Sequence, residues 1–261
     1  MSGGIPLPVL RLDPTSPSSP SSFGAKSMDL DLEQFLRDFP YEPGRLNARI
    51  VRVAEGREVV QVRVEMGVLQ MEAEGRPDRR PSVFARIRER ARQHRGRLTS
   101  GEAAELRLEL VQHQQRAIAF LAIGEPRRAL ADADLVLNGA SLLAETASEL
   151  EGEWAEGARF SAIVLRTRAA AAMLATGGRG REAGALIDAG LDMLRDAAER
   201  AGIGDHFDRL GDVTALRALR DTLVPQLPPA QRSELEARLR AAIQSENFEL
   251  AAILRDELRL L

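Results

Sequence analysis

The last 31 residues of the chain, from Gln231 to Leu261, predict two short amphipathic helices that meet at a polar turn. In the first helix, Leu235, Leu239 and Ala242 recur at steps of four and three residues, which places them on one helical face. The second helix repeats this spacing through Ala251, Leu254, Leu258 and Leu261. Chains below about 40 residues usually need outside help to fold. The apolar edge of this hairpin must therefore pack on the preceding domain, on a copy of itself or on another protein.

The turn between the two predicted helices has the residues of a helix start. Asn247 is a suitable N-cap, because its side-chain oxygen can accept a backbone N–H of the first turn. Glu249 follows in that turn, where the helix dipole favours a negative charge. We expect the ring of Phe248 to cover the first helix, and Ala251 and Ala252 to let the two backbones approach closely.

A set of residues around this turn matches a known motif. The matching positions are Glu246, Phe248, Glu249, Ala251, Ala252, Leu254, Arg255, Asp256 and Leu258. The segment resembles the UVR motif, the helical hairpin of the UvrB and UvrC excinuclease subunits and of activators of bacterial arginine kinases. It covers about an eighth of the chain, and the alternative is an ordinary terminal hairpin with a leucine seam like that of a short coiled coil. The resemblance implies partner-binding roles for Leu235, Leu239, Phe248, Glu249, Ala252, Arg255, Asp256 and Leu258.

The resemblance implies docking and no enzymatic activity. The chain has no cysteine, so it lacks the cysteine pairs that bind zinc in the arginine-kinase activators. It also lacks the helicase motifs of UvrB and the nuclease domain of UvrC. The partners that the resemblance suggests are a Clp-type unfoldase with its arginine kinase, or the nucleotide-excision repair subunits, in a bacterial cytoplasm. Self-association through the hairpin is an open alternative.

Composition excludes several classes of protein. The absence of cysteine excludes a disulfide scaffold and a cysteine-based zinc site, and it fits a reducing cytoplasm. The net charge of −3 argues against a protein that binds nucleic acid over its whole surface. No apolar run approaches the roughly 20 residues that cross a bilayer. We therefore expect no metal, no cofactor and no membrane span.

The first part of the chain predicts a tail and a small sheet. Residues 1–27 hold seven Ser, five Pro and three Gly, a composition that predicts disorder. A short helix then ends at Pro40. Alternating apolar residues predict strands over 48–53 and 59–66, and the alternation resumes after Gly67, where we expect a bulge or bend. The result is a β-meander of two or three strands.

A strongly basic stretch follows this sheet. From Arg76 to Arg97 there are nine Arg against Asp78 and Glu89, a net charge of +7. Arginine matches phosphate geometry well, so one interpretation is a nucleic-acid contact. The other is a solvated helix in an arginine-rich chain, since Phe84 is the only aromatic residue in the stretch. The candidate contact residues are Arg79, Arg80, Arg86, Arg88, Arg90 and Arg92.

From Thr99 to residue 223 the pattern is helical. Thr99 and Glu102 form a predicted capping box. The stretch 116–137 resembles the core of a tetratricopeptide repeat, a helical hairpin with a small residue and an aromatic before a Gly-acid turn and an Ala after it. The matching residues are Ala119, Phe120, Gly124, Glu125 and Ala129. A looser copy has Ala172, Gly178 and Ala183. The alternative is a bundle of helical hairpins with no ligand groove.

Candidate catalytic residues are scarce. His94, His113 and His206 have no metal-ligand spacing, and Asp132 and Asp134 lie on different sides of a helix. The Gly-rich stretch 177–184 lacks the Lys-Ser/Thr of a phosphate-binding loop. We therefore expect a non-enzymatic adaptor that docks a protein through its C-terminal hairpin. The alternative is a nucleic-acid accessory factor that uses residues 76–97.

These patterns predict a mostly α, α+β chain with five parts. The expected order is a tail over 1–27, a helix, meander and Arg-rich segment over 28–98, and a helical-hairpin domain over 99–223. A proline-rich linker over 224–230 then leads to the hairpin at 231–261.

Overall fold

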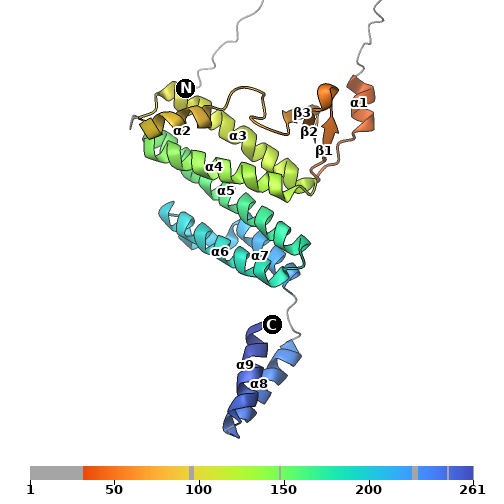
Figure 1. Cartoon of the computed structure of the whole chain (residues 1–261), viewed down its shortest axis with the longest axis vertical. Helices are drawn as coiled ribbons and strands as arrows, with labels where there is room; N and C mark the ends of the chain where they lie inside the picture. The colour runs from red at the N-terminus through yellow and green to blue at the C-terminus, as the bar shows by residue number, and fades with distance from the viewer. Residues whose placement is uncertain (1–31, 94–96, 147, 225–228, 246, 261) are drawn as a thin grey trace, which may run out of the picture. The chain divides into compact units, whose positions relative to one another are not determined.

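The computed structural model describes residues 32–93, 97–146, 148–224, 229–245 and 247–260 (Figure 1). The predicted tail at 1–27 lies outside these residues. Helix α1 (Leu32–Asp38) belongs to a first compact unit that ends at Asp38, and it ends before Pro40, as expected. The elements from Phe39 onward belong to a second unit.

The predicted meander is a three-stranded antiparallel sheet in the order β1-β2-β3. Its strands are β1 (Ala48–Arg52), β2 (Glu58–Val64) and β3 (Gly67–Glu72). Val60 pairs with Ile50 on one side and with Met71 on the other. Residues that face each other across strands share one side of a sheet, so this register gathers the apolar side chains toward the helices.

The second strand is shorter than the alternation predicted. β2 ends at Val64, which pairs with Gly67, so Glu65 and Met66 form the turn of a hairpin. The predicted continuation of the strand to Met66 is wrong, because Met66 lies in this turn, where it is 90% exposed. The bulge or bend expected at Gly67 is a hairpin turn over Glu65 and Met66, and Gly67 is the first residue of β3. A register that buries both Val60 and Met71 requires the turn at this point.

A layer of long helices follows the sheet. It contains α2 (Val83–Gln93), α3 (Ser100–Ala122), α4 (Pro126–Thr146), α5 (Glu149–Thr176), α6 (Gly180–Arg200), the short 3₁₀ helix η2 (Gly204–Arg209) and α7 (Gly211–Leu223). Helices α3 to α6 pack on one another in chain order. Thr99 and Glu102 form the predicted capping box at the start of α3. The fold class is mostly α with a small sheet, as predicted.

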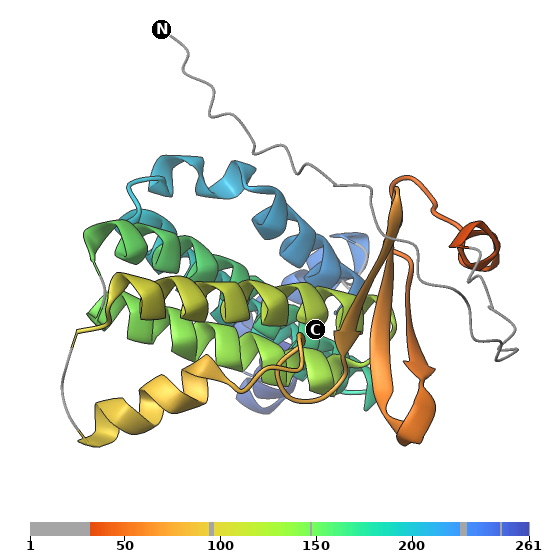
Figure 2. The same cartoon turned by 90° about the horizontal axis from the view of Figure 1, so that it is seen from above.

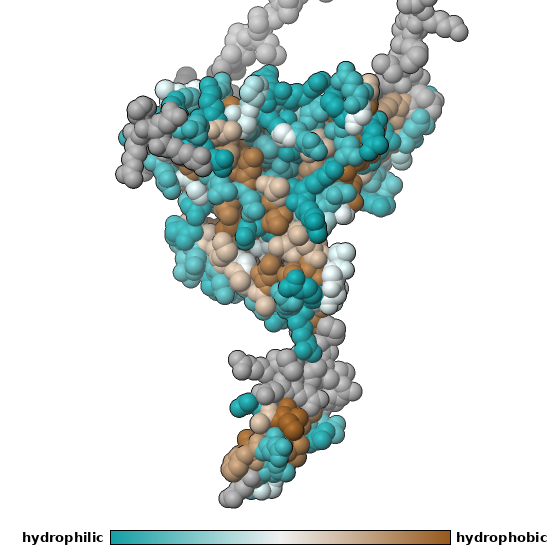
Figure 3. All heavy atoms as spheres, in the orientation of Figure 1, coloured by the Kyte–Doolittle hydropathy of each residue, from teal (hydrophilic) through white to brown (hydrophobic). Residues whose placement is uncertain are grey.

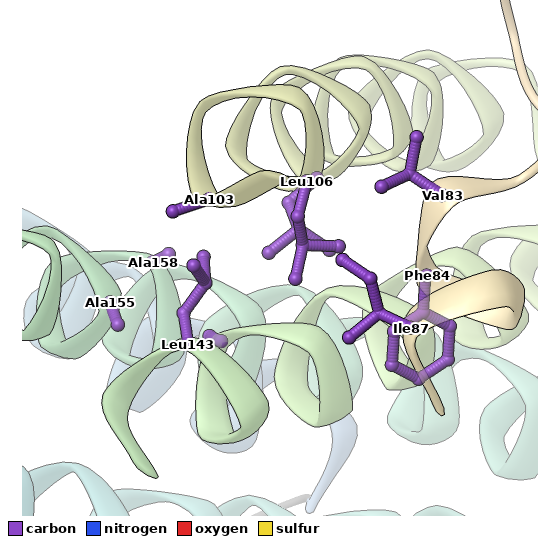
Figure 4. Packing of buried hydrophobic residues seen from close by; sticks show 10 residues of the cluster. Val83, Phe84, Ile87, Ala103, Leu106, Leu143, Ala155 and Ala158 are labelled. Carbon is purple, nitrogen blue, oxygen red and sulfur yellow. The ribbon is translucent and has the colours of Figure 1, made fainter. Parts of the chain in front are cut away.

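Two of the hydrophobic clusters position α2 and the sheet on the long helices. The first joins α2 to α3, α4 and α5, and Figure 4 shows their side chains meeting between the helices, among them Phe84, Leu106 and Leu143. The second sets the sheet against the α3–α4 turn, with Val60 and Met71 packed near Phe120. In Figure 2 the strands stand across the end of the α3–α4 hairpin. The sheet is thus covered on one side by helices, which a sheet this small requires.

The residues that suggested a repeat lie where a helical hairpin needs them. Ala119, Phe120 and Ala129 are buried, and Gly124 has a φ of +78°, a left-handed conformation that glycine adopts without strain. Gly178 takes the same conformation in the α5–α6 turn. Helices α3, α4, α5 and α6 contain 23, 21, 28 and 21 residues. A 34-residue repeat has no room for two such helices, so the hairpins do not form a regular array of that kind.

Candidate functional site

The C-terminal hairpin consists of α8 (Pro229–Gln244) and α9 (Phe248–Leu260). Ala242, Ala251 and Leu254 are buried where the two helices meet. Leu235 and Leu239 pack against them and are partly buried. Within the described residues the seam is therefore buried at Ala242, Ala251 and Leu254 and half-buried at Leu235 and Leu239. The hairpin itself supplies part of the cover that we expected the preceding domain, a second copy or another protein to provide.

The turn of the hairpin is fixed by local hydrogen bonds. The Asn247 Oδ1 atom accepts the Leu250 N–H at 3.1 Å, which is the predicted N-cap. The backbone N–H of Asn247 donates to the Ala242 carbonyl at 2.9 Å, and the Ser245 hydroxyl donates to the same oxygen at 3.1 Å. These bonds satisfy backbone groups at both helix ends, so the turn geometry does not depend on a partner.

The hairpin nevertheless exposes several large apolar side chains. Phe248 is 69% exposed, Ile253 is 58% exposed and Ile243 is 52% exposed. Leu250 is exposed to a smaller degree. Figure 3 shows brown, hydrophobic surface on this hairpin. The ring of Phe248 does not cover the first helix as expected, and it projects into solvent instead.

The structure distributes the predicted partner-binding residues over different environments. Phe248, Glu249 and Arg255 are exposed. Leu235 and Leu239 lie in the seam, and Ala252 is half-buried. The side chains of Asp256 and Leu258 lie outside the described part.

A comparison of the sequence with models of protein families supports the assignment of this hairpin. Residues 230–261 match the model of the UvrB/uvrC motif. The hairpin is a UVR motif. No curated protein and no solved structure matched the chain. The match covers the hairpin and does not extend to the sheet or the helical layer.

Sequence reasoning missed Ile243 and Ile253 as exposed residues of the UVR hairpin. Each is next to a seam residue, Ala242 or Leu254, and lies off the spacing that marks the seam. The sequence signal that indicates their exposure is the position of a large apolar residue directly beside a seam that already has its full set of apolar residues. Together with Phe248, they give the UVR hairpin apolar surface beyond what its own packing uses.

Five arginines of the Arg-rich segment form ion pairs with acidic neighbours. The pairs are Arg76 with Asp78 at 2.9 Å, Arg79 with Glu72 at 3.4 Å, Arg80 with Asp78 at 3.8 Å, Arg86 with Glu105 at 2.8 Å, and Arg90 with Glu102. The hydrogen bond from Arg90, together with those from Thr99, lowers the pKa of Glu102 to about 2. Arg88 lies over the Phe84 ring, 5.3 Å from its centroid. The side chain of Arg92 lies outside the described part.

These pairs weaken the field that a phosphate backbone would meet. We therefore expect no measurable affinity of the full chain for duplex DNA at low salt. Fluorescence anisotropy with a labelled duplex, titrated with sodium chloride, checks this. Binding that weakens steeply as salt rises would contradict it, because that slope reports phosphate contacts. A Glu102→Gln, Glu105→Gln variant, which releases two arginines, serves as the matched comparison.

A buried polar network is the other feature that the sequence did not reveal. Arg116 donates two hydrogen bonds to the Asp132 carboxylate, at 2.8 and 2.7 Å, and the His113 Nδ1 atom lies 2.7 Å from the same carboxylate. Arg116 also donates to the Glu72 carbonyl at 2.6 Å, which ties β3 to α3 and α4. All three side chains are nearly inaccessible to solvent. The network is therefore placed to hold the fold together and not to meet a substrate.

Glu109 extends this network toward α2. Its carboxylate is fully buried and accepts the Ser82 hydroxyl at 2.7 Å. It also accepts the backbone N–H groups of Val83 and Phe84, at 2.7 and 3.0 Å. These are unpaired donors of the first turn of α2, so Glu109 caps that helix from α3.

The described residues contain no cluster of three or more His, Asp or Glu side chains placed to hold a metal ion. Every helix in the described ranges is too short or too polar to cross a membrane.

Proposed function

We propose that the protein is a non-enzymatic adaptor that binds another protein through its UVR hairpin. The observation that carries the proposal is the exposure of Phe248 and Ile253 on a hairpin that already buries Ala242, Ala251 and Leu254 between its own helices. Contiguous apolar surface that remains in water after folding is typical of interaction sites. Aromatic side chains are frequent among the residues that dominate binding energy.

The resemblance suggests the class of partner. UVR hairpins occur in excision-repair subunits and in arginine-kinase activators, so a repair subunit or a Clp-type unfoldase with its kinase is the candidate. We place this role in the cytoplasm, which the absence of cysteine supports. The nucleic-acid alternative stays a prediction, and the DNA titration above is its test.

Affinity capture with purified candidate partners tests the proposal. The full chain is compared with its Phe248→Ala and Ile253→Ser variants. Met66→Ala is the matched control, because Met66 is an exposed apolar residue at a distant sheet turn. We expect both hairpin variants to lose the partner that the full chain and the control retain. Equal retention by all four proteins would remove the hairpin as the docking element.

Stability separates docking residues from packing residues in the same helix. Phe248→Ala should change thermal unfolding little, because the ring is mostly in water. Leu254→Ala should destabilise the UVR hairpin by about 2–5 kcal/mol, because Leu254 is buried in the seam. Hydrogen exchange of the α8 and α9 amides measures the stability of the hairpin in both variants. Faster exchange in Phe248→Ala than in Leu254→Ala would show that the ring belongs to the core.

A further inference from the structure

Helix α3 has a second apolar face, opposite the one that packs in the core. Along this face the residues follow one another at steps of four, three, four, three and four. They are Ala104, Leu108, Val111, Gln115, Ile118 and Ala122. Leu108 is 48% exposed and Ile118 is 41% exposed, so the face is not covered by the protein's own described elements. Figure 2 shows α3 along its length on the near side of the helical layer.

This spacing is the seven-residue repeat by which two helices pack along a common seam. The face, which we call the α3 seam, contains no charged residue, although 29% of the chain is charged. Only Gln115 is polar, and a single polar residue in such a seam lowers the stability of the helix pair. The α3 seam thus has the composition of a helix–helix contact and lacks its partner helix.

The order of residues in the α3 seam is symmetric about His113. Ala104 and Ala122 are equally far from that centre, as are Leu108 and Ile118, and Val111 and Gln115. In an antiparallel copy of α3, Ala104 would therefore meet Ala122, Leu108 would meet Ile118, and Val111 would meet Gln115, which is close to it in size. Antiparallel packing also sets the positive end of each helix dipole near the negative end of the other. The pattern is complementary to itself, as a two-fold interface between identical chains requires.

The surface next to the α3 seam has room for a helix. A groove of about 470 Å³ runs between α3 and α5, with Val111 and Ile118 on one wall and Trp154 on the other. Its α5 wall continues with the small residues Gly157, Ala158 and Ser161, and Glu153 lies at the same wall as its one charged residue. Arg107, which would be a repulsive charge at a two-fold contact, is engaged by Glu151 at 3.5 Å. A helix lying on the α3 seam would place its own large side chains into this groove.

We propose that the α3 seam is a self-association surface, on which α3 of a second copy of this chain packs antiparallel. The inference does not depend on the UVR hairpin, which lies in other elements. The α3 seam is about 27 Å long at 1.5 Å per residue. A contact of this length lies at the small end of specific interfaces. The dimer therefore forms in a concentration-dependent way and dissociates on dilution.

Cysteine pairing tests the interface and its direction, since the natural chain has no cysteine. Leu108→Cys and Ile118→Cys are prepared as two full-length proteins. In the antiparallel register Leu108 faces Ile118 of the other copy, while the two Leu108 positions lie about 15 Å apart along the axis. A disulfide needs Cα atoms within about 7 Å. We expect covalent dimers in the mixture of the two proteins and not in either protein alone.

Three further proteins complete the test. Met193→Cys, an exposed apolar position on α6, should give no covalent dimer. Analytical ultracentrifugation should show that Leu108→Glu raises the dimer dissociation constant at least tenfold, with an unchanged circular dichroism spectrum. Gln115→Leu should lower the constant. Self-linking of Leu108→Cys alone would overturn the antiparallel register. A monomer at all concentrations, with no linked mixture, would overturn the surface itself.

Discussion

Replacing Asp132 with alanine is expected to lower the free energy of unfolding by about 3–5 kcal/mol. The change leaves the Arg116 guanidinium buried without the carboxylate that accepts its two hydrogen bonds. His113 loses its closest partner at the same time. Removing one member of a buried ion pair costs far more than the pair contributes as a whole, because the remaining charge has neither water nor a counter-ion.

Urea denaturation measures this effect, and Asp134→Ala is the matched control. Asp134 lies on the same helix and forms an ion pair with Arg166 at 2.8 Å, but both side chains are well exposed. Surface pairs of this kind contribute about 0–1 kcal/mol. Equal losses in the two variants would contradict a special role for the buried network.

Lowering the pH should destabilise the fold through the same Asp132 carboxylate. Burial by itself raises the pKa of Asp132, but the hydrogen bonds from Arg116 and His113 outweigh it, and the pKa lies below the ordinary value of 3.8. A carboxyl with a lowered pKa in the folded state stabilises the fold above its unfolded pKa. That stabilisation is present above about pH 4 and is lost as the pH falls through the folded-state pKa. The Asp132→Ala variant should lack this part of the acid transition.

Replacing Phe120 with alanine should cost about 3–5 kcal/mol, the range for a large buried ring. Phe120 is fully buried between the sheet and the α3–α4 turn, beside Val60 and Met71. The sheet is small and makes its apolar contact with the helices through this cluster, so the protection of its amides from exchange should fall when the ring is removed. Hydrogen exchange should therefore speed up more in β2 than in α6.

Met193→Ala provides the control for Phe120. Met193 is also a large apolar residue in a long helix, but it is exposed on α6. Its replacement should change the free energy of unfolding by no more than about 0.5 kcal/mol. Uniform acceleration of exchange across both regions in Phe120→Ala would show that sheet and helices unfold as one unit.

Features that depend on residues close in sequence were predictable. The Thr99 capping box and the Asn247 cap follow from neighbours three residues apart, and the alternation around Val60 follows from the period of a strand. These sequence signals are reliable because each depends on local backbone geometry alone. They were sufficient for the fold class and for the position of the UVR hairpin.

Features that depend on distant residues were not predictable. His113 and Asp132 are 19 residues apart and meet only because α3 and α4 form a hairpin. The end of β2 was misplaced because Met66 continues the alternation, and only the pairing with β3 shows where the turn lies. The exposure of Ile253 likewise depends on which face of α9 packs on α8, a choice that the seam spacing alone did not make clear.

The Glu109 cap has a consequence for assembly of the chain. Two backbone donors at the start of α2 are satisfied by a carboxylate about 25 residues further along. During synthesis α2 emerges before that carboxylate, so its first turn lacks this acceptor until α3 has formed and docked. The arginine-bearing helix is therefore completed late, and a fragment that ends before Glu109 would not keep its native beginning.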